Sequence, residues 1–357
     1  MPSTKKLYLN PYMTVQFVNG KAYILDPIKQ RAIKKELLNP SFYFLIKTLS
    51  GDDPLTIATI AEKFKDSPLF HTFSIEDIEK SLEGLVDSGI LVESRDSYDA
   101  YLKWTSKGWR VPFLYHHATN NLLKYNYSLH GEKADIETMK RYCANEKPPE
   151  NLKDFQGSKS INLTKLKLGE IGEDSSDEVS IDTLNKLIHL NFSQIGEVNL
   201  HVTGKHVRKP IPSGGARHPT EIYVFLNEVV GIDDGVYFFN CKRNTLEFIA
   251  SMRSEVFQEC MIRNPDAINF QPKIAFLYTS KYERSMFRYR ESRSYKVLHL
   301  DIGHILQNVT LCCNAMGLKI YNSYASDEKN LSTLLGLKEL DEYPFAFSVV
   351  GSISERI

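Results

Sequence analysis

The chain has 357 residues, of which 42% are hydrophobic and 25% are charged. This composition is typical of a globular protein and excludes the disordered and fibrous classes, and the length leaves room for two domains. Forty-four basic residues balance forty-four acidic ones, so the net charge gives no reason to expect binding to nucleic acid or to an anionic membrane.

No segment has the features of a membrane helix or a targeting sequence. Apolar runs stay well short of the roughly 18 residues that a membrane helix needs, and the first residues lack the apolar core of a signal peptide. The five cysteines are scattered and include no C-x-x-C pair, which argues against a disulfide framework or a zinc site. We therefore expect a cytoplasmic protein that binds no metal.

Residues 1–108 predict a small domain of their own. Its expected elements are a strand at 21–27, helices at 41–49, at 56–64 and from Ser74 to Gly89, and a strand at 90–93. Three short helices followed by a strand pair are typical of a winged helix. The third helix, however, carries Glu76, Asp77, Glu79 and Glu83 against Lys80, whereas DNA phosphates require a basic face. We predict a peptide-docking or scaffolding domain instead of a DNA-binding one.

Residues 109–156 mix aromatic patches with polar stretches, which predicts an extended connector. Residues 157–357 alternate helical and strand patterns and predict a second domain. Its expected elements are helices at 181–192 and 297–316 and strands at 221–226, 235–239, 245–249, 274–277 and 345–351. The helix at 297–316 is apolar on nearly every side, so we expect it to be fully buried, at a domain centre or in a dimer seam.

Three segments of the second domain carry candidate chemistry. In 212–219 (PSGGARHP), two glycines let backbone amides approach a ligand, and Arg217 adds a permanently charged donor. Residues 284–295 hold four arginines and two tyrosines. Residues 300–304 (LDIGH) place Gly303 inside a helix at a cost of about 1 kcal/mol, which predicts close packing there. Taken singly, these segments also fit a tight loop, a charged surface connector and a core histidine.

Together, the series PSGGARHPTEIY, RSMFRYRESRSY and LDIGHILQN, followed by Ala-Met-Gly-Leu, resembles the SagB/McbC-type branch of the nitroreductase-like flavoprotein superfamily. The resemblance covers roughly residues 155–357, and the leading unit resembles the N-terminal domain of many of these enzymes. It implies an α+β, nitroreductase-like fold with a mixed sheet flanked by helices. It also implies a homodimer with FMN bound at the dimer interface.

The resemblance also assigns cofactor-binding residues. They lie on two segments, one with Ser213, Gly214, Gly215 and Arg217 and the other with Arg293 and Tyr295. The early Arg-Ser phosphate motif of the family appears here only as Lys159-Ser160. Lysine offers phosphate a point charge without the two-pronged fork of arginine.

The branch is known for oxidoreductases that modify ribosomally made precursor peptides. Its azoline dehydrogenases, which form thiazoles and oxazoles, carry a Lys-Tyr pair where this chain has Arg288-Tyr289. Azoline oxidation needs a proton acceptor, and arginine stays protonated. In the reduction of dehydroalanine to D-alanine, Arg288 would instead stabilise a developing enolate oxygen while Tyr289 protonates the α-carbon.

The sequence therefore favours an FMN-dependent dehydroamino-acid reductase of lanthipeptide (lantibiotic) biosynthesis. It leaves open an azoline dehydrogenase and a catalytically inactive docking subunit. The expected partners are a precursor peptide, a second copy of the chain and other enzymes of the same peptide-modifying pathway. NADPH is a candidate electron donor, and the sequence does not decide between it and other donors.

Overall fold

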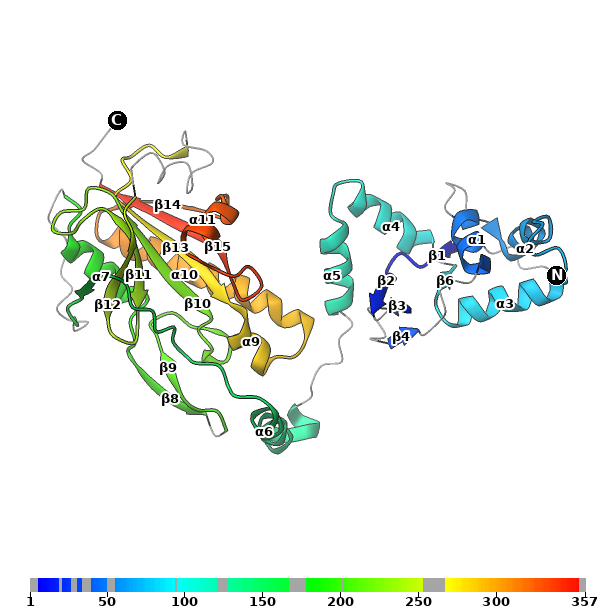
Figure 1. Cartoon of the computed structure of the whole chain (residues 1–357), viewed down its shortest axis with the longest axis horizontal. Coiled ribbons are helices and arrows are strands. Elements are labelled where there is room, and N and C mark those ends of the chain that lie inside the picture. The colour runs from blue at the N-terminus through cyan, green and yellow to red at the C-terminus, as the bar shows by residue number, and fades with distance from the viewer. Residues whose placement is uncertain are drawn as a thin grey trace. The chain divides into compact units, whose positions relative to one another are not determined.

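The structure is a computed structural model, and it describes residues 6–18, 21–26, 31–33, 40–49, 55–93, 95–120, 127–166, 178–200, 202–252 and 267–352 (Figure 1). The chain divides into two compact units, Met1–Tyr125 and Asn126–Ile357. The division lies inside the segment 109–156 that the sequence predicts as a connector. None of the described helices is long and apolar enough to span a membrane.

The first unit contains the three predicted helices, α1 (Pro40–Leu49), α2 (Ile57–Lys65) and α3 (Ile75–Asp87). Ser74 caps α3 as expected, because its side chain accepts a hydrogen bond from the amide of Asp77. Apolar residues at helical spacing face inward, and Leu45, Ile60 and Leu82 form a core with Leu7 of the first strand.

The strands of this unit differ from the winged-helix expectation. A three-stranded sheet has the order β5-β1-β6, formed by β5 (Leu55–Thr56), β1 (Lys6–Leu9) and β6 (Leu91–Val92). The partner of β6 is thus the strand at the start of the chain, and helix α4 (Arg95–Thr105) follows β6. The predicted strand pair after the third helix is therefore wrong. The residues after β6 form a helix because Tyr98, Tyr101 and Trp104 recur at helical spacing and pack against other rings.

A second, antiparallel sheet consists of β2 (Thr14–Val18), β3 (Lys21–Asp26) and β4 (Arg31–Ile33), and β3 matches the strand predicted at 21–27. The predicted extended connector is wrong over most of its length. It contains α5 (Arg110–Asn120) and α6 (Tyr127–Asn145), the latter interrupted at Gly131 with φ +68°. Aromatic residues that suggested irregular chain instead bury a helix face, as Phe113 does beside Trp104.

The second unit is built on a seven-stranded sheet with the order β14-β15-β13-β10-β11-β12-β7. Its strands are β7 (Ser160–Asn162), β10 (Thr220–Leu226), β11 (Gly235–Asn240), β12 (Thr245–Ala250), β13 (Ile274–Lys281), β14 (Lys319–Ser323) and β15 (Glu342–Gly351). Each pairing between these described strands is antiparallel, where the resemblance predicts a mixed sheet. A hairpin of β8 (Gly196–Leu200) and β9 (Gly204–Arg208) precedes β10 and has no counterpart in the sequence prediction.

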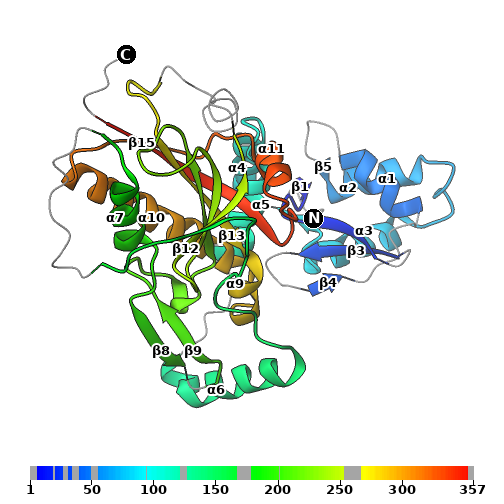
Figure 2. The ribbon, with the colours of Figure 1, turned by 60° about the vertical axis from the view of Figure 1, so that its left-hand side comes forward.

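Both faces of this sheet are covered (Figure 2). Helices α7 (Ile181–Asn191) and α10 (Tyr295–Ala315) pack on one face and α11 (Glu328–Leu334) packs on the other. Because both faces are buried, the central strand β10 is apolar throughout its centre instead of alternating with polar residues.

Helix α10 is only half buried within the chain. Ile302 and Val309 face the core, whereas Leu300 is 61% exposed and Leu311 is 56% exposed. Full burial at a domain centre is therefore wrong, and burial of the other face in a dimer seam stays a prediction.

Candidate active site

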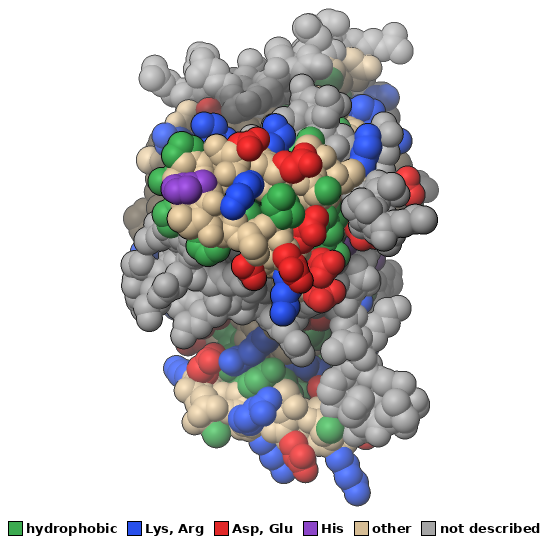
Figure 3. Space-filling view, turned by 90° about the vertical axis from the view of Figure 1, so that its right-hand side faces the viewer, with side chains coloured by type: hydrophobic (Ala, Val, Ile, Leu, Met, Phe, Trp, Pro, Cys, Tyr) green, Lys and Arg blue, Asp and Glu red, His purple; other side chains and the backbone are tan. Residues whose placement is uncertain are grey.

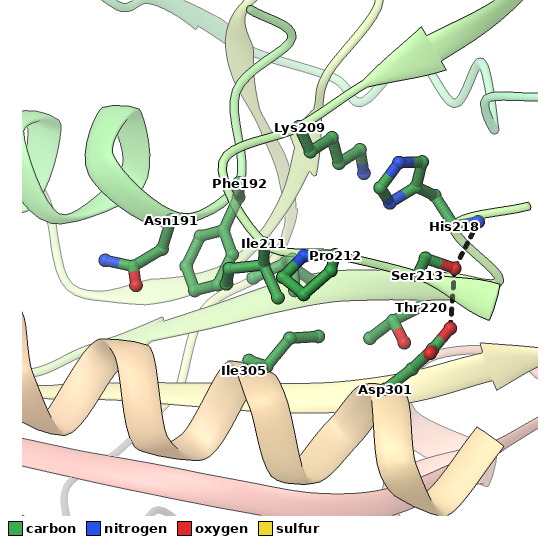
Figure 4. A pocket seen from close by; sticks show the side chains of 11 residues that line it. Asn191, Phe192, Lys209, Ile211, Pro212, Ser213, His218, Thr220, Asp301 and Ile305 are labelled. Atoms are coloured by element: carbon green, nitrogen blue, oxygen red, sulfur yellow. Dashed lines mark hydrogen bonds between the residues drawn. The ribbon is translucent and has the colours of Figure 1, made fainter. Parts of the chain in front are cut away.

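The turn that links β9 to β10 is held in an unusual backbone conformation. Gly215, Ala216 and His218 have φ values of +61°, +53° and +43°, and positive φ is uncommon for residues other than glycine. The Ser213 hydroxyl donates to Asp301 Oδ2 at 2.6 Å and accepts from the His218 amide at 2.9 Å (Figure 4). Strained backbone that the surrounding structure enforces is concentrated at functional sites.

Asp301 of α10 fixes the start of this turn. Its Oδ1 also accepts from the Gly214 amide at 3.1 Å. Burial raises the pKa of Asp301, against the opposing effect of the hydrogen bonds from Ser213 and Gly214. The sequence marked Asp301 only as part of LDIGH, and its partnership with the turn becomes visible only in the fold.

The two glycines of the turn make room for protein side chains. A Cβ on Gly214 would lie 2.3 Å from Val297 Cγ1, and a Cβ on Gly215 would lie 2.2 Å from the Tyr289 hydroxyl. The sequence interpretation was that these glycines allow backbone amides to reach a ligand. In the structure they allow α10 and Tyr289 to pack directly against the turn.

Arg217 is buried with an unused donor. Its Nη1 lies 3.3 Å from His206 Nε2, and its Nε has no hydrogen-bond partner among the described residues. Burial lowers the pKa of His206 to about 4, and the Arg217 charge adds to this effect. At neutral pH the site therefore holds a neutral imidazole beside a guanidinium. A buried donor without a partner is costly, so this arrangement fits an anionic group supplied by a ligand.

Arg288, which the sequence analysis assigns to a developing enolate oxygen, is paired with a carboxylate in the structure. At the end of α9 (Tyr282–Arg288), its Nη2 donates to both carboxylate oxygens of Asp135 in α6, at 2.8 and 2.9 Å. The guanidinium carbon lies 5.1 Å from the centroid of the Tyr289 ring. Arg288 and Tyr289 are therefore neighbours as predicted, but Asp135 compensates the charge of Arg288.

Tyr289 and Tyr295 line one pocket of about 840 Å³ between α9 and the start of α10. Tyr295 is 45% exposed and lies near the rings of Tyr282 and Phe345. Arg293 makes a looser contact, 3.6 Å from Glu291. The pocket and the turn meet at Tyr289, whose hydroxyl lies against Gly215.

Lys159 and Ser160 lie elsewhere, at the β7 end of the sheet. Lys159 Nζ contacts Asp233 at 2.5 Å, and Ser160 donates to Glu247 at 2.8 Å. In the strand order, β11 and β12 separate β7 from β10. The structure therefore does not bring this pair to the turn with the other predicted cofactor residues.

A buried ion pair anchors the turn from its other end. Arg284 of α9 contacts Glu221 of β10 at 2.5 Å and donates to the His218 carbonyl at 3.0 Å. Both side chains are 3% exposed. The sequence placed Arg284 in its arginine-rich segment without this structural role. Among the described residues, no three metal-ligating side chains are placed together.

Comparison with known proteins gives a consistent set of relatives, although no family model matches the chain. The trifolitoxin-processing protein TfxB of Rhizobium leguminosarum bv. trifolii is 30% identical over 377 residues, covering 98% of each chain. A candidate nitroreductase of Methanocaldococcus jannaschii is 31% identical over 171 residues, which cover 47% of this chain and 80% of that protein. The microcin B17-processing protein McbC of Escherichia coli is 26% identical over 147 residues, covering 40% and 51% of the two chains.

Proposed function

Because the chain belongs to the SagB/McbC-type branch of the nitroreductase-like superfamily, we propose that it is an FMN-dependent oxidoreductase that modifies a ribosomally synthesised precursor peptide. Two relatives carry names that describe the processing of peptide products, trifolitoxin and microcin B17. The observation that carries the proposal is the buried Arg217 with its unused donor. It lies in the same turn as Gly215, the residue that the Tyr289 hydroxyl contacts.

The turn offers a flavin one buried donor, and its backbone amides serve to hold its shape. The Nε donor of Arg217 can bind an anionic part of the cofactor. The amides of Gly214 and His218 are occupied by Asp301 and Ser213, so they hold the turn in shape and are not free for the ligand. When bound, a flavin accepts or supplies a hydride at this site, and the protein provides orientation and charge.

The finer proposal is reduction of a dehydroamino acid. The reaction would add a hydride to the β-carbon of dehydroalanine and a proton to the α-carbon, and a bound flavin would supply the two electrons, which originate from a nicotinamide donor such as NADPH. Negative charge develops on the substrate amide oxygen, where Arg217 stabilises it electrostatically. We assign delivery of the proton to Tyr289, whose ring centroid lies 5.1 Å from the Arg288 guanidinium carbon and whose hydroxyl lies against Gly215.

The sign of the mass change tests the direction of the reaction. The purified protein is incubated with NADPH and a dehydroalanine peptide, or with oxygen and a thiazoline peptide. The masses of the product peptides are then measured by mass spectrometry. Gain of two hydrogen atoms per residue supports the reductase. Loss of two hydrogen atoms from the thiazoline peptide alone contradicts it and assigns an azoline dehydrogenase. Protein without flavin absorbance and without either reaction would be a docking subunit.

Variants separate cofactor binding from chemistry. Arg217→Ala and Gly215→Val should both lower FMN retention, the first by removing a donor and the second by displacing Tyr289 from the turn. Tyr289→Phe should keep FMN but slow peptide reduction by roughly 10²-fold, as for loss of one catalytic proton donor. The matched control is Tyr324→Phe, because Tyr324 is 80% exposed and lines none of these pockets. Unchanged flavin occupancy in both turn variants would contradict the assignment of the turn.

We extend the proposal to the first unit, as a peptide-docking module. A groove of about 870 Å³ between α1 and α3 is lined by apolar side chains that include Phe42, Phe73 and Leu85. Acidic side chains gather on the face of the molecule that Figure 3 shows, and the exposed surface of α3 is acidic. This combination suits an apolar segment of the precursor that is flanked by lysine or arginine. Phe73→Ser, at a 52% exposed position, should weaken peptide binding without changing flavin content.

The same proposal includes a homodimer that uses the exposed face of α10. Large apolar side chains such as Leu300 and Leu311 are unusual on a surface that stays in water. Sedimentation of the flavin-loaded protein as a stable monomer would contradict this part of the proposal.

A further inference from the structure

Helix α6 contacts the segment around Tyr289 at two points. Arg288 is bound by Asp135, as described above. Arg290 donates through Nη1 and Nη2 to the two carboxylate oxygens of Glu146, both at 3.0 Å, and its guanidinium lies 3.8 Å from the centroid of the Tyr142 ring. The residues on either side of Tyr289 are thus both held by α6 or the residue that follows it.

These contacts fix the backbone that carries the Tyr289 side chain. Tyr289 ends α9, with its amide donating to the Ser285 carbonyl at 2.9 Å and its φ and ψ at −114° and 90°. The chain therefore leaves the helix at this residue, and helix geometry no longer determines where the side chain goes. The position of its hydroxyl against Gly215 depends on what holds Arg288 and Arg290.

The two contacts differ in their surroundings. The side chains of Arg288 and Asp135 are 18% and 27% exposed, whereas those of Arg290 and Glu146 are 36% and 54% exposed. Both pairs use both carboxylate oxygens, so the difference between them is exposure: water screens the Arg290–Glu146 pair more than the less exposed Arg288–Asp135 pair. Asp135 is therefore the stronger of the two anchors.

We propose that Asp135 is a positioning residue of the reaction site, which holds Arg288 over the Tyr289 ring and so sets the place of the Tyr289 hydroxyl. This inference rests on the proposed function, because it assigns Asp135 a part in peptide redox chemistry. Helix α6 thereby contributes a residue that supports the site, in a segment where the sequence predicts a connector. Asp135 touches neither substrate nor cofactor in this role and acts through Arg288 and Tyr289.

The test compares Asp135→Asn and Asp135→Glu with Glu137→Gln, a matched loss of a carboxylate at an exposed position of the same helix. The first readout is turnover of the peptide, with reduction of the bound flavin by NADPH measured separately. Asp135→Asn should lower turnover by roughly tenfold to a hundredfold, as expected when a reacting group is misplaced by about 1 Å. Flavin content and flavin reduction should stay at the wild-type level, and Asp135→Glu should recover part of the loss.

The second readout does not depend on turnover. Phenylglyoxal modifies accessible guanidinium groups, and mass spectrometry of the labelled peptide reports the rate at Arg288. The rate should rise in Asp135→Asn and remain at the wild-type value in Glu137→Gln. Turnover of Asp135→Asn within twofold of wild type would overturn the inference, as would an equal loss in Glu137→Gln. If the wild type changes no peptide while Arg288 labelling still rises, the contact is real but the proposed function has failed, and the positioning role falls with it.

Discussion

Acidification tests the charge arrangement around the turn. Burial lowers the pKa of His206 to about 4, with Arg217 adding to the effect. Burial also lowers the pKa of His218 to about 3, with smaller contributions from Lys209 and Arg284. In the unfolded chain, both imidazoles titrate near about 6.5. Because the folded values are lower, the unfolded chain binds more protons below that pH. The histidines therefore contribute their full stability above about pH 6.5 and lose it as the pH falls.

The size of the effect follows from these values. While only the unfolded chain is protonated, each pH unit removes about 1.4 kcal/mol per histidine from the free energy of unfolding. Between about pH 6.5 and 4.5, the two histidines together remove about 4 kcal/mol, because the unfolded imidazoles are only half protonated at the start of this range. We expect this loss in urea unfolding curves recorded by circular dichroism across that range.

Substitution of the two histidines isolates their share from that of other titrating groups. His206→Gln keeps a polar group toward Thr203, and His218→Asn suits the positive φ at that position, which asparagine tolerates better than most residues. The double variant should lose most of the pH dependence in this range. Equal slopes in the wild type and the double variant would refute the reasoning, because the folded protein would then already hold protonated imidazoles.

Substitutions at the buried ion pair, at Arg217 and in α10 test the remaining interactions. Arg284→Leu should lower the free energy of unfolding by about 3–5 kcal/mol because Glu221 stays buried and unpaired, and the double variant Glu221→Leu/Arg284→Leu should lose less. Urea unfolding measures both, and a single loss below about 1 kcal/mol would contradict the burial of the charge. Arg217→Leu should raise the melting temperature of the flavin-free protein, because it removes a buried donor without a partner, and a lower value would contradict this. Gly303→Ala should weaken the homodimer in sedimentation, although its Cβ meets nothing within 4 Å in the chain. An unchanged dimer with a stability gain of about 1 kcal/mol would exclude Gly303 from the seam.

The elements that the sequence predicts correctly are those with local signals. Helix α3 has a capping serine and an apolar period, and β10 and β11 are short apolar runs between turns. The pairing of strands that lie far apart in the sequence has no such local signal. The partner of β6 is β1, more than eighty residues earlier in the chain, so the sheet of the first unit could not be inferred from the residues near β6. The helices α5 and α6 were missed because their mixed composition gives a weak period.

In the candidate site, too, the residues in local motifs were predicted and the residues that bind distant partners were not. The turn at Ser213–His218 and the Arg288-Tyr289 pair were predicted from motifs, and the structure brings them together where Tyr289 meets Gly215. Asp301 and Asp135 were not assigned these roles, because they lie 88 and 153 residues from the groups they bind. A lone aspartate in a helix gives no indication of such a partner. Both carboxylates bind groups that the sequence did predict, Asp301 the Ser213 hydroxyl and Asp135 the Arg288 guanidinium.

In the proposed reaction, this difference changes which arginine is assigned to the negative charge that develops on the substrate. The sequence argument assigned the oxyanion to Arg288, but Asp135 compensates that charge and leaves Arg217 as the buried cation with an unused donor. A group accelerates a reaction only if it interacts more strongly with the transition state than with the ground state. A carboxylate-bound guanidinium is already satisfied before the reaction. In the proposed reaction, the Nε donor of Arg217 is assigned to the cofactor, and the positive charge of the same guanidinium acts on the substrate oxygen as negative charge develops there. Arg288→Lys therefore tests geometry, since it keeps the charge beside Asp135 but loses the planar group over Tyr289. Substitution of Arg217 tests charge only when turnover is measured per bound FMN, because the same variant should also lower FMN retention.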